Sequence, residues 1–160
     1  MGTDLAGISG GALTDTYTST TSQGIADLGE MKWVDGKLYK FVEIVDQDVA
    51  VNEVLYPANT TGTNFTSDAS GGSGLTAMVG AVALGTVDIS AASYAWVQVC
   101  QPGTFGTVRS DGSVAAGEAI IGHTVDGEAD TFAAGEEHLV FAYALEADSG
   151  SPVTCAVQFV

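Results

Sequence analysis

The chain has few positive charges. Among its 160 residues, Lys and Arg total 4 against 20 Asp and Glu, so the formal net charge is −16. A protein that binds nucleic acid needs clustered cations to neutralise phosphates, and an anionic membrane surface makes the same demand. Three of the four cations, Lys32, Lys37 and Lys40, lie close together in the sequence. The composition excludes nucleic acid and membranes as partners and predicts an acidic, well-solvated surface.

Histidine is also scarce. His123 and His138 are the only two, and neither stands in a recognisable catalytic motif. Asp126, Glu128 and Asp130 alternate along a predicted turn, and carboxylates spaced in this way can offer oxygen ligands to Ca²⁺. The stretch does not continue into a calcium-binding loop pattern, and the chain has no glycine motif for phosphates or dinucleotides. We therefore expect no enzymatic activity, no bound metal and no cofactor.

Only two cysteines occur, Cys100 and Cys155. Both lie in apolar runs, which favours buried free thiols and leaves a disulfide between them open. The N-terminus has neither the basic start nor the apolar core of a signal peptide, and no apolar run approaches the length that crosses a membrane. We expect the protein to be made and folded in a cytoplasm.

Short apolar runs and turn signals fill most of the chain. Gly is abundant at 21 residues, and only 15% of the residues are charged. Regularly spaced short strands of this kind predict an all-β protein, a single compact β-barrel or sandwich. The clearest hairpin spans residues 31–45 around Asp35-Gly36, a type I′ turn signal. Residues 57–74 form a long polar loop of a kind that is either functional or disordered.

Three blocks of sequence recur in the same order, which predicts an internal duplication. One half alone would bury only about 60% of the surface of its unfolded chain, so we expect two fused copies in one β domain (31–160) rather than two independent domains. The predicted pseudo-repeats span about 31–90 and 91–160. The matching blocks are Tyr39–Ile44 with Tyr94–Val99, Val49–Tyr56 with Val114–Ile121, and Val79–Leu84 with Val140–Leu145.

Residues 1–30 show neither helical nor strand periodicity. They form either a disordered leader or an extended arm that becomes ordered on a partner, for example by adding a strand to it. The apolar residues of this segment are scattered, and those of its first part are Leu5, Ile8, Leu13 and Tyr17.

Several aromatic residues lie in or next to the predicted strands. They could form a ligand platform, but rigid rings of this kind more often fill a core or a subunit interface. The strand at 39–44 is apolar on both faces, so we expect cover on both sides, from the other sheet or from another subunit. The residues predicted for the core or a subunit interface are Trp33, Tyr39, Phe41, Tyr94 and Trp96.

Short strings in the chain resemble small virion proteins of tailed bacteriophages, above all head decoration (cement) proteins. The resemblance covers about Leu28 to Val160 and leaves the N-terminal segment unmatched. Ala95 stands where the family has Gly, and Asn52 interrupts the first Gly turn. The strings are Leu28-Gly29-Glu30, Asp35-Gly36-Lys37, Tyr39 to Val42, Tyr94 to Gln98, Val114 to Ala119 and Ala144-Leu145-Glu146.

The resemblance implies a tulip-like barrel that forms homo-oligomers, trimers above all, and binds the major capsid protein on the outer face of the virion. The arm and the lysine hairpin would face the capsid, and a chain without residues 1–30 would fold but not bind. A tail- or fibre-associated adhesive or carbohydrate-binding module is the first alternative, and a hydrolytic enzyme using His123 and His138 is the second. The residues expected to face the capsid are Leu5, Ile8, Leu13, Tyr17, Lys32, Lys37 and Lys40.

Overall fold

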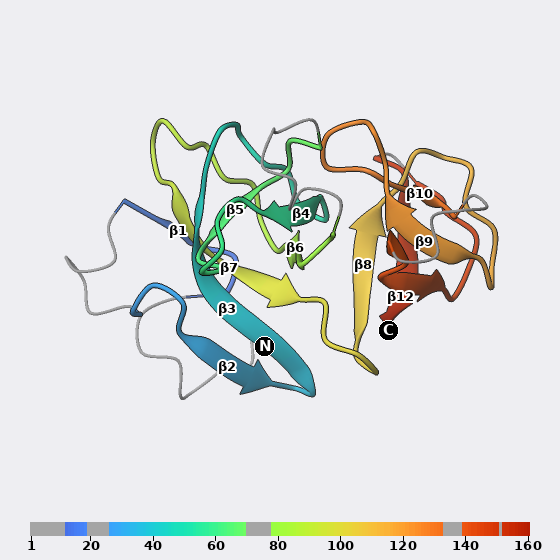
Figure 1. Cartoon of the computed structure of the whole chain (residues 1–160), viewed down its shortest axis with the longest axis horizontal. Helices are drawn as coiled ribbons and strands as arrows, with labels where there is room; N and C mark the ends of the chain where they lie inside the picture. Colours follow the sequence, from blue (N-terminus) through green and yellow to red (C-terminus); the bar gives the residue numbers. More distant parts are fainter. Residues whose placement is uncertain (1–11, 19–25, 70–77, 133–138, 151) are drawn as a thin grey trace.

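The computed structural model describes residues 12–18, 26–69, 78–132, 139–150 and 152–160. The regular elements in these ranges are β-strands, which confirms the all-β prediction. Leu5, Ile8 and His138 lie outside the described residues. Figure 1 shows two lobes side by side, with β1–β7 in one lobe and β8–β12 in the other.

The first lobe contains a closed barrel, here called the first ring. Its strands follow the order β7-β6-β4-β5-β3, and β3 pairs back onto β7 to close it. All contacts are antiparallel except that between β3 and β5. The strands are β3 (Lys37–Ile44), β4 (Val54–Pro57), β5 (Asn64–Thr66), β6 (Ala81–Ala83) and β7 (Tyr94–Val99).

Two further strands extend this ring. β2 (Met31–Val34) pairs antiparallel with the start of β3 and forms an outer edge, while β1 (Thr16–Tyr17) pairs with the start of β7. Asp35 and Gly36 both have positive φ, at 49° and 75°, as the predicted type I′ turn between β2 and β3 requires. The hairpin prediction is confirmed.

The second lobe is a five-stranded sheet in the order β10-β9-β11-β12-β8. A parallel bridge between Ser110 and Ala129 joins its two edges, so the sheet curls into a second ring. The strands are β8 (Phe105–Arg109), β9 (Ala119–Gly122), β10 (Ala129–Thr131), β11 (Ala142–Ala144) and β12 (Thr154–Phe159).

The two rings have the same topology and the same register. Leu55 pairs with Ala81 in the first ring, and Ile120 pairs with Ala142 in the second, as the sequence match predicts. The parallel contact between β3 and β5 recurs as the bridge at Ser110. Left-handed backbone recurs at matching turn positions, which are Asp46 and Gly112, Asn52 and Gly117, and Gly62 and Gly127.

One predicted match is wrong. Tyr39–Ile44 and Tyr94–Val99 are β3 and β7 of the same ring, where they pair with each other. The pairing register instead equates β3 with β8 and β7 with β12. The division between the copies therefore falls between Val99 and Phe105, later than the expected boundary near residue 90. The two strands look alike because each is covered on both faces, which selects apolar residues along their whole length.

Three apolar clusters hold the molecule together. One fills the interior of the first ring and includes Val42, Leu55 and Val97. The largest fills the interior of the second ring around Ile120 and Val157, and it continues onto the first ring. The residues that the first ring adds to this cluster are Val54, Tyr56, Val79 and Val82. The two rings therefore share one core.

The third cluster covers the outer face of β3 and β7. Phe41 and Trp96 are fully buried there, and Tyr17 and Ala26 from the N-terminal segment pack over them. Tyr17 meets Phe41 edge-to-face, with 5.8 Å between ring centroids. The second cover that the doubly apolar strand requires is thus a segment of its own chain.

Candidate functional site

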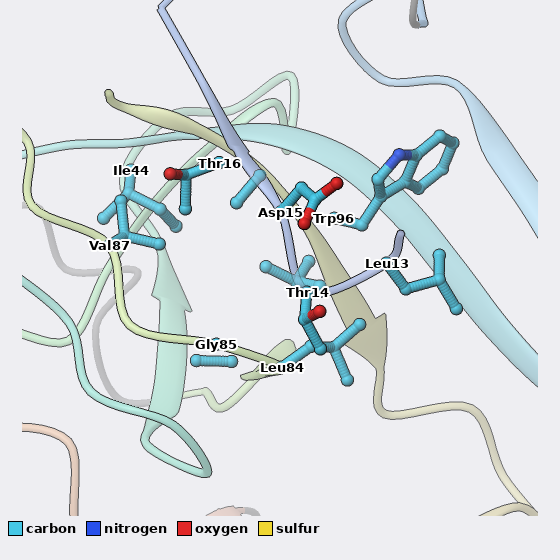
Figure 2. Close-up of a pocket in the computed structure, with 12 residues that line it drawn as sticks. Leu13, Thr14, Asp15, Thr16, Ile44, Leu84, Gly85, Val87 and Trp96 are labelled. Atoms are coloured by element: carbon cyan, nitrogen blue, oxygen red, sulfur yellow. The ribbon is translucent and has the colours of Figure 1, made fainter. Parts of the chain in front are cut away.

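The described part of the N-terminal segment lies on its own domain. Figure 2 shows Thr14 to Thr16 crossing between Gly85 and Trp96, and the space left there is too narrow for a water molecule. Tyr17 is buried and Leu13 packs against the same cluster. Leu13 and Tyr17, expected to face a capsid, are therefore not presented outward. The physical reason is the apolar outer face of β3 and β7, which this segment covers.

The β2–β3 hairpin exposes two large apolar side chains at the edge of the first lobe. Met31 and Trp33 are 59% and 61% exposed and lie on one face of the hairpin, together with Lys40, the cross-strand partner of Met31. β2 has β3 as its one strand neighbour, so its other edge is free among the described strands. Exposed large apolar side chains beside a free strand edge mark a contact surface.

The lysines of the hairpin have different surroundings. Lys32 pairs with Glu30 at 3.1 Å and stands 5.0 Å above the ring of Trp96, and Lys40 donates to the carbonyl oxygen of Gly62. Lys37 makes no ion pair with any described residue. Lys32 and Lys40 thus contribute to the fold, while Lys37 is the lysine of this group that a partner could engage.

The aromatic residues predicted for the core or a subunit interface also divide into buried ones and one that is available to a partner. Tyr39, Phe41 and Trp96 are buried, and Tyr94 is half-buried and stacked on Phe41 with 6.3 Å between ring centroids. Trp33 is exposed. Four of the five thus belong to the cluster on β3 and β7, and Trp33 is free to meet another molecule.

The joint between the rings is closely fitted. The side chain of Tyr56, from β4, lies against Gly122 of β9 so closely that a Cβ at Gly122 would overlap its hydroxyl group. The hydroxyl donates to the carbonyl oxygen of His123 at 3.4 Å. Burial, followed by the nearby charge of Asp126, raises the pKa of Tyr56 to about 12. Tyr56 is therefore a side chain of the first ring that packs into the core of the second.

An ion-paired seam lines this joint. Arg109 pairs with Glu53 at 2.9 Å and with Glu128 at 3.3 Å, so one cation from the second ring holds a carboxylate of each ring. Gly127 donates its N–H to the carbonyl oxygen of Ser67 and accepts from the N–H of Val54. The shared core, the ion pairs and the backbone hydrogen bonds together join the two rings.

A small polar cluster lies at the rim of the second ring. Ligand atoms of Asp111, His123 and Asp130 are within 4.8 Å of one another, a spacing that a divalent cation could bridge. However, the N–H of Val125 donates to Nδ1 of His123 at 3.1 Å. The proton of the neutral imidazole therefore sits on Nε2, which lies 3.7 Å from Asp130. This arrangement favours a contact from His123 to Asp130 over metal ligation.

Both cysteines are free thiols, as the favoured reading of the sequence predicts. Cys155 is buried within the second ring, and Cys100 packs against the same apolar cluster. Burial raises the pKa of both thiols. Neither thiol is activated as a nucleophile, because the reactive thiolate is disfavoured in both.

Comparison with protein-family models gives no match, and comparison with curated protein sequences gives none either. In the described ranges, no helix has the length and apolar character needed to span a bilayer.

Sequence reasoning missed several surface residues. Met31 escaped notice although Met31-Lys32-Trp33-Val34 alternates the sides of an edge strand, with Met31 and Trp33 on the same face. Phe105, Tyr143 and Leu145 were also missed, and all three are exposed on the second ring. The only available signal was again alternation, because Tyr143 and Leu145 flank the buried Ala144.

Proposed function

We propose that this chain is a non-enzymatic structural protein of a tailed-phage virion. It binds the major capsid protein on the outer surface of the head as a homo-oligomer and stabilises the head. The observation that carries the proposal is the sealed joint between the rings. A clamp between capsomers must transmit load without yielding, and two closed rings that share a core and an ion-paired seam meet that requirement.

The hairpin supports the same function. Residues 30–40 carry three cations and two carboxylates, a net charge of +1 in a chain whose total is −16. Complementary charge guides association and sets register more than it adds affinity. Lys37 is the residue of this group without an internal partner among the described residues, so it is the one assigned to capsid contact. Leu5 and Ile8 stay predicted contacts of the N-terminal segment.

Binding to capsids that lack the protein tests this function. The wild-type chain should co-sediment with such capsids and raise the temperature at which they release DNA. Lys37→Ala should weaken the binding, whereas Thr124→Asp, which changes the net charge equally at an exposed site on the second ring, should not. Equal binding by the two variants would remove Lys37 from the contact, and no binding by the wild-type chain would refute the proposed function.

One observation favours the alternative of a tail- or fibre-associated adhesive module. Trp33 is largely exposed on a strand edge, and an exposed indole is a stacking surface for sugar rings. Binding to host surface polysaccharide that is lost in Trp33→Ala, together with no binding to capsids, would favour this alternative.

A further inference from the structure

The outer face of the second ring carries an apolar patch, here called the second-ring patch. Phe105 and Tyr143 both lie opposite Gln158 on its two sides, so they share one face of three adjacent strands. Leu145 follows Tyr143 by two residues and lies on the same face. The three side chains are 51%, 47% and 50% exposed. Three large apolar side chains exposed on one sheet face are more than scattered surface residues.

The matching face of the first ring is covered. Tyr39 occupies the position that Phe105 has in the second ring, and it is buried in the cluster that also holds Tyr17 and Ala26 of the N-terminal segment. The segment passes there because Gly85 has no side chain, since a Cβ would stand 2.8 Å from the carbonyl oxygen of Thr14. In the matched sequence blocks, Glu146 follows Leu145 where Gly85 follows Leu84. The second ring therefore has a Glu side chain at the position over which the segment passes in the first ring, and among the described residues its face is open to a different occupant.

The charge of the second ring selects that occupant. Residues 105–160 contain nine carboxylates and a single cation, Arg109. Contact between two second-ring patches would place like charges together. The hairpin face, formed by Met31, Trp33 and Lys40, exposes two large apolar side chains within the one stretch of net positive charge, residues 30–40. Its chemistry complements the patch.

We propose that the hairpin face of one copy docks on the second-ring patch of the next copy, head to tail. The proposal rests on the homo-oligomeric part of the proposed function and names its contact surfaces. A head-to-tail contact joins two different surfaces, so it repeats from copy to copy and closes into a cyclic oligomer where the rotation allows.

The size of the contact sets its strength. A large side chain can bury about 150–250 Å², and the five apolar residues of the two surfaces are each about half exposed, so the contact could bury on the order of 500 Å² of their area. These residues are Met31, Trp33, Phe105, Tyr143 and Leu145. Stable interfaces bury about 1,200 Å² or more in total. Self-association in solution should therefore be weak and concentration-dependent, and a capsid lattice that holds copies side by side would raise their effective concentration.

Sedimentation velocity over a range of concentrations, without capsids, tests the contact separately from the proposed function. Two variants each remove one surface. The hairpin variant carries Met31→Ser and Trp33→Ser, and the patch variant carries Tyr143→Ser and Leu145→Ser. Wild-type protein should associate as its concentration rises, and neither variant should associate alone. The control Val51→Ser, at an exposed apolar site outside both surfaces, should associate like the wild type.

Mixing the two variants gives the decisive result. The hairpin variant keeps an intact patch and the patch variant keeps an intact hairpin, so the mixture should form heterodimers and stop there. Association of the hairpin variant alone would indicate patch-to-patch contact and overturn the proposal, and association of the patch variant alone would do the same for hairpin-to-hairpin contact. Wild-type protein that stays monomeric at all concentrations would also overturn it.

Discussion

At the scale of single residues, Tyr56 and Gly122 decide how closely the rings fit. The aromatic side chain of Tyr56, from the first ring, packs directly on Gly122 of β9. Its Cε1 lies only 2.9 Å from where a Cβ of residue 122 would stand. Any side chain at residue 122 must move this ring or separate the lobes. The contact is thus the most sensitive single point of the joint.

Gly122→Ala should destabilise the protein by about 1–3 kcal/mol, the usual cost of overpacking a filled site. Tyr56→Phe should cost less, since its hydroxyl makes only a 3.4 Å hydrogen bond. Because the hydroxyl is the atom nearest the new methyl group, the double variant should be more stable than the sum of the two changes predicts. Urea unfolding measures all three, and simple additivity would show that the two residues do not meet.

The pKa of Tyr56 gives a pH dependence. Its folded-state pKa is raised from 10.0 to about 12 by burial, so the folded protein holds the phenol proton more tightly than the unfolded chain does. The stabilisation is complete below pH 10 and is lost as the pH rises from 10 to 12. A shift of this size corresponds to roughly 2–3 kcal/mol.

Urea unfolding at pH 8 and pH 11.5, compared between wild type and Tyr56→Phe, isolates this effect. Other buried tyrosines titrate in both proteins and cancel in the comparison. The wild type should lose more stability than the variant over this interval. Equal losses would mean that Tyr56 is not buried in the joint.

At the scale of elements, one matched pair of positions changes from apolar in the first ring to polar in the second. In the first ring Ile44 and Val87 are both in the apolar interior. In the second ring Ser110 matches Ile44, because Ser110 pairs with Ala129 as Ile44 pairs with Phe65. Asp148 matches Val87, because its N–H donates to the carbonyl oxygen of Val114 as the N–H of Val87 donates to that of Val49. Ser110 donates to Asp148 at 2.8 Å, so a hydrogen bond replaces an apolar contact.

Asp148→Val alone should cost about 1–3 kcal/mol, because Ser110 and the N–H of Val114 lose their acceptor. Adding Ser110→Ile recreates the pair of the first ring and should recover much of that loss. Thermal unfolding compares the single and double variants. A double variant less stable than Asp148→Val would contradict the structural equivalence of the two interiors.

The N-terminal segment belongs to the same scale. Deleting residues 1–30 removes Tyr17 and Ala26 from the cluster over Phe41 and Trp96, so the deletion should destabilise the first ring and not merely release a binding arm. The milder change Gly85→Val should push the segment off through the clash with Thr14. Hydrogen exchange at residues 12–18 should then accelerate, while Thr86→Ala leaves it unchanged. Unchanged exchange in Gly85→Val would contradict the docked position.

The sequence predicted the elements better than their partners. The turn at Asp35-Gly36 and the matches of β4 with β9 and β6 with β11 follow from local chemistry, because turn residues and inward-facing apolar residues are read directly from the chain. The match of β3 with β7 was wrong because both strands are covered on both faces, and this burial alone makes their sequences alike without a shared origin. The true counterpart of Trp96 is Ala156, which lies on the outer face of β12. No described residue covers that face, so a large apolar side chain is not needed there and the sequence similarity is lost.

The same limit applies to the candidate site. Leu13 and Tyr17 were expected to face outward, because an isolated apolar residue in a polar segment gives no sign of which surface it covers. Arg109 gave no sign that it would join Glu53 to Glu128, since these residues are far apart in the sequence and meet only when both rings are folded.

At the scale of the whole molecule, the protein is one two-ring body with a basic hairpin on the first ring and an acidic second ring. The rings share a core, and the hairpin face and the second-ring patch expose apolar side chains that a neighbouring molecule could contact. This combination suits a protein present in many copies on a large regular surface, where a weak contact between neighbours repeats.

The most direct test of the proposed function is the copy number of this protein relative to the major capsid protein, measured by quantitative mass spectrometry on purified virions of the phage proposed to carry it. A head decoration protein should give a ratio of order one, as for a component that covers the head. A handful of copies per particle would favour a tail or fibre position, and complete absence from the particle would contradict the proposed function.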